Sequence, residues 1–317
     1  MSLDILTIGE ALVEIMRTGI DQPLDRPGPF TGPYPSGAPF IFAAQAARLG
    51  ANVAAIGSVG DDAFGRCLID QLHADHIDTS GIQILNTHTT GVAFVAYNAD
   101  GSRDFVFHVP HSAAGQITPD IVKPELFDGL KCLHLMGSTL SMHQSAIDTG
   151  LRALELAKAA GAKFSFDPNL RPQMLPHEQA RVKFQPFVTA ADVLIPTAEE
   201  ACILTAKSNL DDAVKALLDM HPDRIVIITQ GAQGCTVYTA NEQIHVPGFS
   251  VTEVDPTGAG DCFDAGFLTQ WLNGASLEQA ARFANACGAL AVTQQGPMAG
   301  AQTLAHVQAF INHQTGI

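Results

Sequence analysis

Short apolar runs alternate with longer segments whose apolar residues recur every three to four positions. The runs predict buried strands, and the longer segments predict amphipathic helices. The first pair is a strand at Asp4–Gly9 and a helix at Gly37–Leu49, with Ser36 as N-cap and Gly50 as stop. Further strands are expected at Asn52–Ile56, Lys131–Leu135, Lys163–Phe166, Asp192–Ile195, Arg224–Thr229, Cys235–Thr239 and Gln243–Val246. Further helices are expected at Ala63–Ala74, Gln144–Ala160, Glu178–Thr189, Ala198–Thr205, Leu210–Met220, Gly258–Trp271, Leu277–Thr293 and Leu304–His313. Strand–helix alternation predicts an α/β fold with a mainly parallel sheet that helices cover on both faces.

Two segments interrupt this alternation. Gly91–Val109 has the pattern of a β-hairpin, with Asp100 and Gly101 in its turn. Ala11–Pro35 has extended character and is rich in Pro and Gly. We expect these segments, at about 11–35 and 90–110, to form a small β-sheet lid. Because no composition break marks a linker, residues 1–317 are expected to form a single domain.

Composition narrows the function. The 317 residues are 46% hydrophobic and 15% charged, a mixture that can bury a large core. The net charge of −15 disfavours nucleic acid as a partner. Neither a membrane span nor a secretory signal is present, and the six cysteines lack zinc-site spacing, so we expect reduced thiols and a cytoplasmic protein. An acidic protein that binds an anion needs a local group that attracts the anion despite the negative net charge.

One loop has the features of such an anion-binding group. The segment Asp255-Pro256-Thr257-Gly258-Ala259-Gly260-Asp261 opens a predicted helix. Free N–H groups at Gly258, Ala259 and Gly260 would form an anion site, and Asp261 beside them is a candidate general base. Phosphoryl transfer needs little more than this combination. A plain acidic first turn, favourable against the helix dipole, is the alternative. The sequence contains no P-loop motif, and no dinucleotide fingerprint follows the first strand, which disfavours an oxidoreductase.

The same loop resembles the C-terminal signature of the ribokinase-like (PfkB) sugar kinases, D-T-x-G-A-G-D or D-x-T-G-A-G-D. Further matches follow in the order that this family shows. They are Gly9-Glu10-Ala11-Leu12-Val13, Pro35-Ser36-Gly37-Ala38-Pro39, Val59-Gly60-Asp61-Asp62-Ala63-Phe64-Gly65, Phe166-Asp167-Pro168-Asn169-Leu170-Arg171 and Ile228-Thr229-Gln230-Gly231-Ala232-Gln233-Gly234. The resemblance spans nearly the whole chain and implies the three-layer ribokinase-like fold.

This resemblance implies that the γ-phosphate of ATP passes to a hydroxyl of a sugar, with Asp261 as the base and Gly258, Ala259 and Gly260 as the anion hole. Mg2+ would accompany ATP, held largely through phosphates and water. The nucleotide-binding candidates are Thr229, Gly231, Gly234 and Asn285, with Thr257 beside the phosphates. A polar residue on a helix face is the alternative role for Asn285. The sequence also allows a monovalent cation such as K+ near Asp255 and Thr257.

The sugar is expected under the lid. The candidate substrate-binding residues are Glu14, Gly37, Arg103, Phe107, His108, Asn169 and Arg171. Glu14 stands where related kinases often place an acid that accepts hydrogen bonds from sugar hydroxyls. The alternatives are that Phe107 only packs the hairpin and that Arg103 is a solvated charge. Lid sheets in the family often pair across a two-fold axis, which predicts a homodimer.

The sequence departs from the family pattern at several positions. Ser36 replaces the first Gly of P-G-G-A-P, and Ile41 replaces an Asn that faces the sugar. In place of N-x-x-E the chain has Thr197-Ala198-Glu199-Glu200, so Glu200 is expected to act only indirectly around magnesium. Val109 stands where kinases of 2-keto-3-deoxygluconate tend to have an Arg for the substrate carboxylate.

These departures favour a neutral ketohexose, fructose- or tagatose-like, as the substrate. A 2-keto-3-deoxygluconate kinase that uses Arg103 or Arg171 is the alternative within the class. A nucleoside kinase is less favoured, because the lid has few aromatic residues to stack a base. A non-catalytic sugar-binding regulator on the same fold is the alternative from another class, and the intact Asp261 argues against it.

Overall fold

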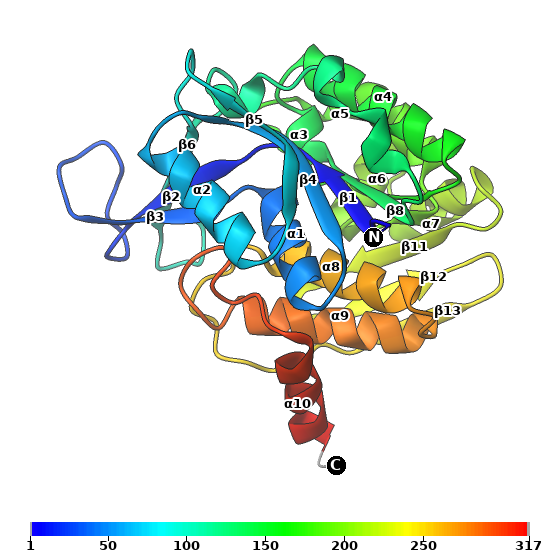
Figure 1. Ribbon diagram of the computed structural model, residues 1–317. Coiled ribbons are helices and arrows are strands. Elements are labelled where there is room, and N and C mark those ends of the chain that lie inside the picture. Colours follow the sequence, from blue (N-terminus) through cyan, green and yellow to red (C-terminus); the bar gives the residue numbers. More distant parts are fainter. Residues whose placement is uncertain (1, 316–317) are drawn as a thin grey trace.

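A nine-stranded sheet runs through the middle of the computed structural model, which describes residues 2–315 (Figure 1). Its strand order is β13-β12-β11-β10-β9-β8-β1-β4-β5. Pairing is parallel from β11 to β5, whereas β12 and β13 are antiparallel at one edge. The strands are β1 (Ile5–Ile8), β4 (Val53–Gly60), β5 (Asp78–Leu85), β8 (Cys132–Met136), β9 (Lys163–Asp167), β10 (Val193–Leu194), β11 (Ile225–Thr229), β12 (Cys235–Tyr238) and β13 (Gln243–Val246). The predicted α/β class is confirmed.

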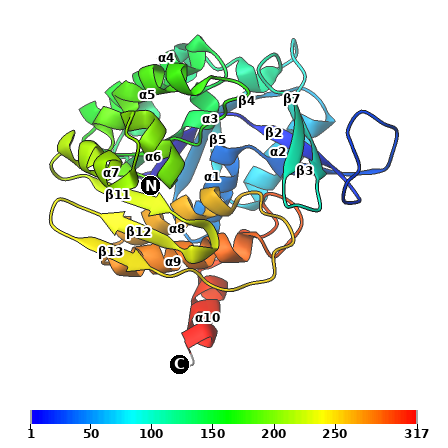
Figure 2. The same cartoon turned by 180° about the vertical axis from the view of Figure 1, so that it is seen from behind.

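Helices cover both faces of this sheet and make three layers, as the two opposite views show (Figures 1 and 2). Successive strand side chains point to opposite faces, so Ile5 packs in one apolar core and Leu6 in the other. The first core is covered by α1 (Ala38–Arg48), α2 (Ala63–Ala74), α8 (Ala259–Leu272), α9 (Leu277–Ala291) and α10 (Leu304–Thr315). The second is covered by α3 (Gly137–Leu140), α4 (Gln144–Ala159), α5 (His177–Ala190), α6 (Ala198–Thr205) and α7 (Leu210–Asp219), together with short 3₁₀ turns within residues 113–127.

A separate four-stranded sheet, called the lid below, projects from one side of the molecule (Figure 1). Its order is β3-β2-β6-β7, from β2 (Leu12–Arg17), β3 (Phe30–Ser36), β6 (Gly91–Tyr97) and β7 (Arg103–His108). The hairpin β6–β7 has the predicted turn, and β2 pairs in parallel with β6. The two segments that interrupt the alternation therefore do share one small sheet.

Two local predictions are wrong. Ser36 is not the N-cap of α1, because it ends β3 and its hydroxyl donates to Glu14 at 2.7 Å. Gly37 is the N-cap instead, at φ 107, and a Cβ there would meet the carbonyl oxygen of Glu10 at 2.0 Å. The strand β5 is absent from the predicted elements, because as an edge strand it has a single buried residue and lacks a clear alternation.

The described residues include all six cysteines and all of the assigned helices. All six cysteines are free, four of them buried and Cys67 and Cys202 half-buried. Among the described helices, none combines the length and the apolar character that a membrane crossing requires.

Candidate active site

Two cavities meet at the first turn of α8. One, of about 380 Å³, lies between the lid and the carboxyl ends of the central strands, and is called the lid cavity. The other, of about 720 Å³, lies between the end of β11, the segment after β13 and helices α8 and α9, and is called the outer cavity. Pro256, Ala259 and Gly260 line both. A group held at this turn is therefore accessible from either side.

The first turn of α8 is built to present backbone amides. Its N-cap is Gly258, which has φ 86 and no side chain to bond those amides. A Cβ on Gly258 would lie 2.7 Å from the carbonyl oxygen of Pro297, so glycine is required there. At Gly260 a Cβ would meet nothing within 4 Å, because the turn opens to the cavities. Uncapped N–H groups at a helix N-terminus attract an anion without any net positive charge on the protein.

Asp261 follows in the same turn and lines the lid cavity. The residue as a whole is only 7% exposed. Burial raises its pKa well above the ordinary value, the charge of Asp167 adds to the rise, and Arg171 opposes it. A carboxyl with a raised pKa, next to an anion site and open to a cavity, has the properties of a general base.

Two other side chains offer buried oxygens to the lid cavity. Glu14, on β2, accepts the Ser36 hydroxyl with one oxygen, while its Oε2 has no hydrogen-bond partner in residues 2–315. Burial raises the pKa of Glu14 to about 7, with Asp255 adding to the rise. Asn169 follows β9 at φ 38 and is held by Asp167, which accepts its backbone N–H and its amide at 3.0 and 2.9 Å. Its Oδ1 is likewise buried without a partner in the described chain.

Two arginines face these acids. Arg103 reaches from β7 and donates to the Thr257 hydroxyl at 2.9 Å. Arg171 lies beyond β9, and its charge acts on Asp261 and Glu10. The charged residues that line the lid cavity are thus three carboxyls and two guanidinium groups. The lining carries no excess of positive charge.

The structure brings most of the predicted substrate-binding residues together. Glu14, Gly37, Arg103, Phe107, Asn169 and Arg171 all line the lid cavity. His108 does not, because exposure alternates along β7 and places its side chain on the outer face of the lid, edge-on to Phe94. The prediction of His108 as a sugar contact is therefore corrected by the period-two geometry of the strand.

The predicted nucleotide residues are divided between the cavities. Thr229, Gly231, Gly234 and Asn285 line the outer cavity. The Asn285 amide donates to the carbonyl oxygens of Val246 and Pro247 at 3.0 and 3.1 Å, so it braces the wall. Thr257 instead lines the lid cavity, where its hydroxyl accepts from Arg103.

Glu200 has a positioning role. Its Oε1 accepts the backbone N–H of Leu170 at 2.8 Å, and its Oε2 accepts the N–H and hydroxyl of Thr197 in a capping box. Both oxygens are thus engaged with the protein, and they tie the loop after β9 to α6. Residues 2–315 contain no group of three or more His, Cys, Asp or Glu side chains arranged to hold a metal ion.

Several cavity residues were not predicted from the sequence. Glu10 and Ser138 follow β1 and β8, at the strand ends where α/β sheets bind ligands, and this position could have revealed them. Phe105 lines the lid cavity and stacks on Phe107 with centroids 5.1 Å apart. Outside the linings of both cavities, Tyr97 donates its hydroxyl to Asp255 at 2.8 Å, a contact between residues 158 positions apart that no local pattern indicates.

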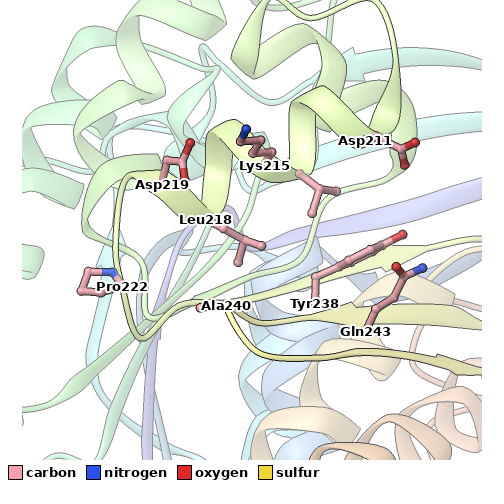
Figure 3. A pocket seen from close by; sticks show the side chains of 9 residues that line it. Asp211, Lys215, Leu218, Asp219, Pro222, Tyr238, Ala240 and Gln243 are labelled. Atoms are coloured by element: carbon pink, nitrogen blue, oxygen red, sulfur yellow. The ribbon is translucent and has the colours of Figure 1, made fainter.

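A further hollow, of about 660 Å³, lies between α7 and the β12–β13 hairpin (Figure 3). Leu218 and Tyr238 are among its apolar residues, and Asp211, Lys215 and Asp219 lie around it (Figure 3). Tyr238 pairs with Val226 near the start of β11, so this hollow is at the opposite end of that strand from Thr229. It contains none of the predicted site residues.

Comparison with known proteins agrees with this geometry. Residues 4–304 match the pfkB family of carbohydrate kinases. Fructokinase-1 of Zea mays is 34% identical over 315 residues, covering 97% of each chain, and Fructokinase-1 of Oryza sativa subsp. japonica is 35% identical over 300 residues, covering 92% of each.

Solved structures show the same likeness. An E. coli protein provisionally named ribokinase II, crystallised with ATP and Mg2+, is 40% identical with a TM-score of 0.94, covering 99% of this chain and 100% of that one. Fructokinase from Vibrio cholerae O395, with fructose, ADP and calcium bound, is 31% identical with a TM-score of 0.85, covering 98% and 100%. The fold is therefore the ribokinase-like fold, and this chain belongs to the pfkB family of carbohydrate kinases.

Proposed function

We propose that this protein is an ATP-dependent kinase that phosphorylates a hydroxyl of a neutral, fructose-like ketohexose. The observation that carries the proposal is the position of Asp261. Its carboxyl lines the lid cavity at the uncapped first turn of α8, where that cavity meets the outer cavity. Sugar and nucleotide can thus approach one anion site from opposite sides. An intact base at this junction favours a catalyst over a non-catalytic sugar-binding regulator.

The roles of the chain's own residues follow from their positions. Asp261 takes the proton of the acceptor hydroxyl as that oxygen attacks phosphorus. The amides at Gly258, Ala259 and Gly260 stabilise the charge on the phosphoryl oxygens. Arg171 adds positive charge beside Asp261. Arg103 holds the Thr257 hydroxyl next to the same turn.

The residues present fit MgATP as the phosphoryl donor, which supplies the γ-phosphoryl group with its charge partly neutralised. Glu200 has both oxygens engaged, so Mg2+ would be held mainly through phosphates and water, with Glu200 acting indirectly. Both carboxyl oxygens of Asp255 are engaged as well, because they accept hydrogen bonds from Tyr97, Thr257 and Gly296. A monovalent cation near Asp255 would therefore depend mainly on backbone carbonyl oxygens of the surrounding loop.

The charge of the lid cavity supports a neutral sugar. Its arginines are outnumbered by carboxyls, and Val109 lines the cavity where a carboxylate partner would be needed. A substrate carboxylate would be desolvated beside Glu10 and Glu14, which is unfavourable. A kinase of 2-keto-3-deoxygluconate is thus the second candidate, with Arg171 as the partner of the carboxylate. The fructokinase relatives, and the fructose bound in the Vibrio cholerae structure, support the first.

A coupled assay of ADP release tests the choice. Fructose, tagatose, ribose, 2-keto-3-deoxygluconate and a nucleoside would be compared at equal concentration with MgATP, in the presence and absence of K+. We expect the highest kcat/KM with a neutral ketohexose. Turnover confined to the keto-deoxy acid would overturn the proposal.

Two predictions from the sequence stay open. We propose a homodimer through the outer face of the lid, where Phe30 and Val106 are 40% and 43% exposed. Sedimentation of the wild type and of Val106→Asp would test it, and a monomeric wild type would contradict it. The cytoplasmic location also stays a prediction.

A further inference from the structure

Behind Asp261 lies a second carboxyl that the transfer reaction does not use. Asp264 is three residues further along α8, and its side chain is only 2% exposed. It lies within hydrogen-bonding reach of Asp167, the last residue of β9. Its Oδ2 has no hydrogen-bond partner in residues 2–315 and is 3.7 Å from the Nε2 of His134 on β8.

The largest charge effects on Asp264 all come from carboxyl groups. They come from Asp167 on β9, Asp261 on α8 and Glu200 on α6. His134 is no counterion, because complete burial lowers its pKa to about 3 and leaves the ring neutral. Its ring stacks on Phe42 of α1 at 4.0 Å, and its Nδ1 is 3.1 Å from the Ser165 hydroxyl.

This surrounding decides the protonation state. A buried carboxylate without a counterion is strongly unfavourable, and two carboxyls in contact can form a hydrogen bond only when one of them carries a proton. Asp167 already accepts two N–H groups of Asn169, which stabilise its ionised form. Asp264 has no such donors at its free oxygen. The shared proton therefore belongs on Asp264.

We propose that Asp264 is a positioning residue that stays protonated and donates its O–H to Asp167, so that the buried cluster keeps its proton there and Asp261 is free to ionise as the base. Burial raises the pKa of Asp264 well above its ordinary value, with Asp167 and Asp261 adding to the rise. The donated bond also fixes Asp167, and through it the Asn169 amide at the lid cavity. The effect on catalysis rests on the proposed function, whereas the protonation state does not.

Infrared difference spectroscopy tests the protonation state directly. The spectrum of the full chain at neutral pH, minus that of Asp264→Asn, is expected to contain the carbonyl stretch of a protonated carboxylic acid. The control is Asp219→Asn, which alters an exposed carboxyl on α7 and should remove only a carboxylate band. A carboxylate band in place of the acid band for Asp264 would overturn the proposal. No sugar turnover is needed, so this result stands even if the proposed function fails.

The pH profile of kcat tests the positioning role. Asp264→Ala removes the donor from Asp167, so kcat should fall roughly 10- to 100-fold, with the acid limb of the profile moved to higher pH. Asp264→Asn keeps a neutral donor and should restore most of this loss, with the acid limb unmoved. An acid limb that moves to lower pH in Asp264→Asn would mean that a negative charge was removed, which overturns the proposal. A wild-type pH profile in Asp264→Ala would overturn the proposal as well. If that variant fails to fold, the pH profile of Asp264→Asn and the infrared spectrum still test the proposal.

Discussion

At the scale of single residues, the site is defined by oxygens that are buried and have no partner in residues 2–315. Glu14 Oε2 and Asn169 Oδ1 are such atoms, and both belong to residues that line the lid cavity. Leaving a buried polar atom unpaired costs about 1 to 3 kcal/mol, so these atoms indicate a ligand that pairs with them. Sugar hydroxyls can donate to both.

Asp261→Asn should abolish most of the activity, because the amide cannot take the hydroxyl proton. We expect kcat to fall by roughly 10³-fold, within the usual contribution of a general base. The affinity for MgATP should change little, since Asp261 lines the lid cavity and not the outer one. ADP release and nucleotide titration measure the two effects. With exposed Asp219→Asn as the control, near-normal turnover in Asp261→Asn would show that another group is the base.

Glu14→Gln should weaken sugar binding and yet stabilise the free protein at alkaline pH. Burial raises the pKa of Glu14 from 4.5 to about 7, so the folded state holds its proton more tightly than the unfolded state. The resulting stabilisation is complete below pH 4.5 and is lost as the pH rises through 7, an effect of about 3 kcal/mol. Asp167 has a pKa raised to about 7 as well and acts in the same direction.

The glutamine has no charge to desolvate. The Glu14→Gln variant should therefore not lose the contribution that Glu14 makes to the unfolding free energy of the wild type at low pH. Urea denaturation at pH 5 and pH 8 measures it, with exposed Glu242→Gln as the matched control. The KM for the sugar should rise roughly tenfold or more, as expected for a lost hydrogen bond to a charged acceptor. A variant that loses as much stability as the wild type between the two pH values would contradict the assigned pKa.

At the scale of elements, the lid and the loop before α8 act on each other through two side chains. Tyr97, at the end of β6, bonds Asp255, and Arg103, at the start of β7, bonds Thr257. Asp255 is 1% exposed and also accepts the N–H groups of Thr257 and Gly296. The lid sheet is thereby attached to both ends of the segment that leads into the anion site.

Tyr97→Phe removes one of these bonds without changing the ring. A hydrogen bond to a charged, buried carboxylate contributes roughly 1.5 to 3 kcal/mol, so the unfolding free energy should fall by about this amount. The kcat should fall as well, because Asp255 orders the Thr257 backbone. The control is Tyr34→Phe, which removes a lid hydroxyl paired with the neutral Thr31 hydroxyl and should cost less. Equal losses in the two variants would argue against a special role for the Asp255 contact.

The predicted elements also show which parts of the fold could be inferred from the sequence. The two segments that interrupt the strand–helix alternation indicated the lid sheet, and the alternation itself was sufficient for the parallel sheet. It was insufficient for β5, whose pattern of exposure has no regular period. It misassigned His108, because a hairpin sequence does not say which strand face the cavity will occupy. That face is set by packing against the main sheet.

At the scale of the whole molecule, the net charge of −15 repels an anionic nucleotide, while the attraction is local to the α8 amides and two arginines. Raising ionic strength from about 0.01 M to about 0.1 M shortens the Debye length from about 30 Å to about 10 Å and screens the distant charges most. We therefore expect kcat/KM for MgATP to rise about twofold over this range, with K+ held constant.

The control is the kcat/KM of the neutral sugar at saturating MgATP, which should not respond to salt. A fall of the nucleotide value with salt would show that the arginines near the site, and not the overall charge, control association.

The sequence by itself determined the chemistry of one turn: glycines that open a helix N-terminus, an aspartate beside them, and the strand–helix alternation around them. These are local properties, because backbone freedom and helix dipoles depend on neighbours in the chain. The tertiary structure alone decided which distant residues meet there. Glu14, Arg103 and Asn169 converge on Asp261 from three elements, and the raised pKa values arise because packing removes water and brings carboxyls together.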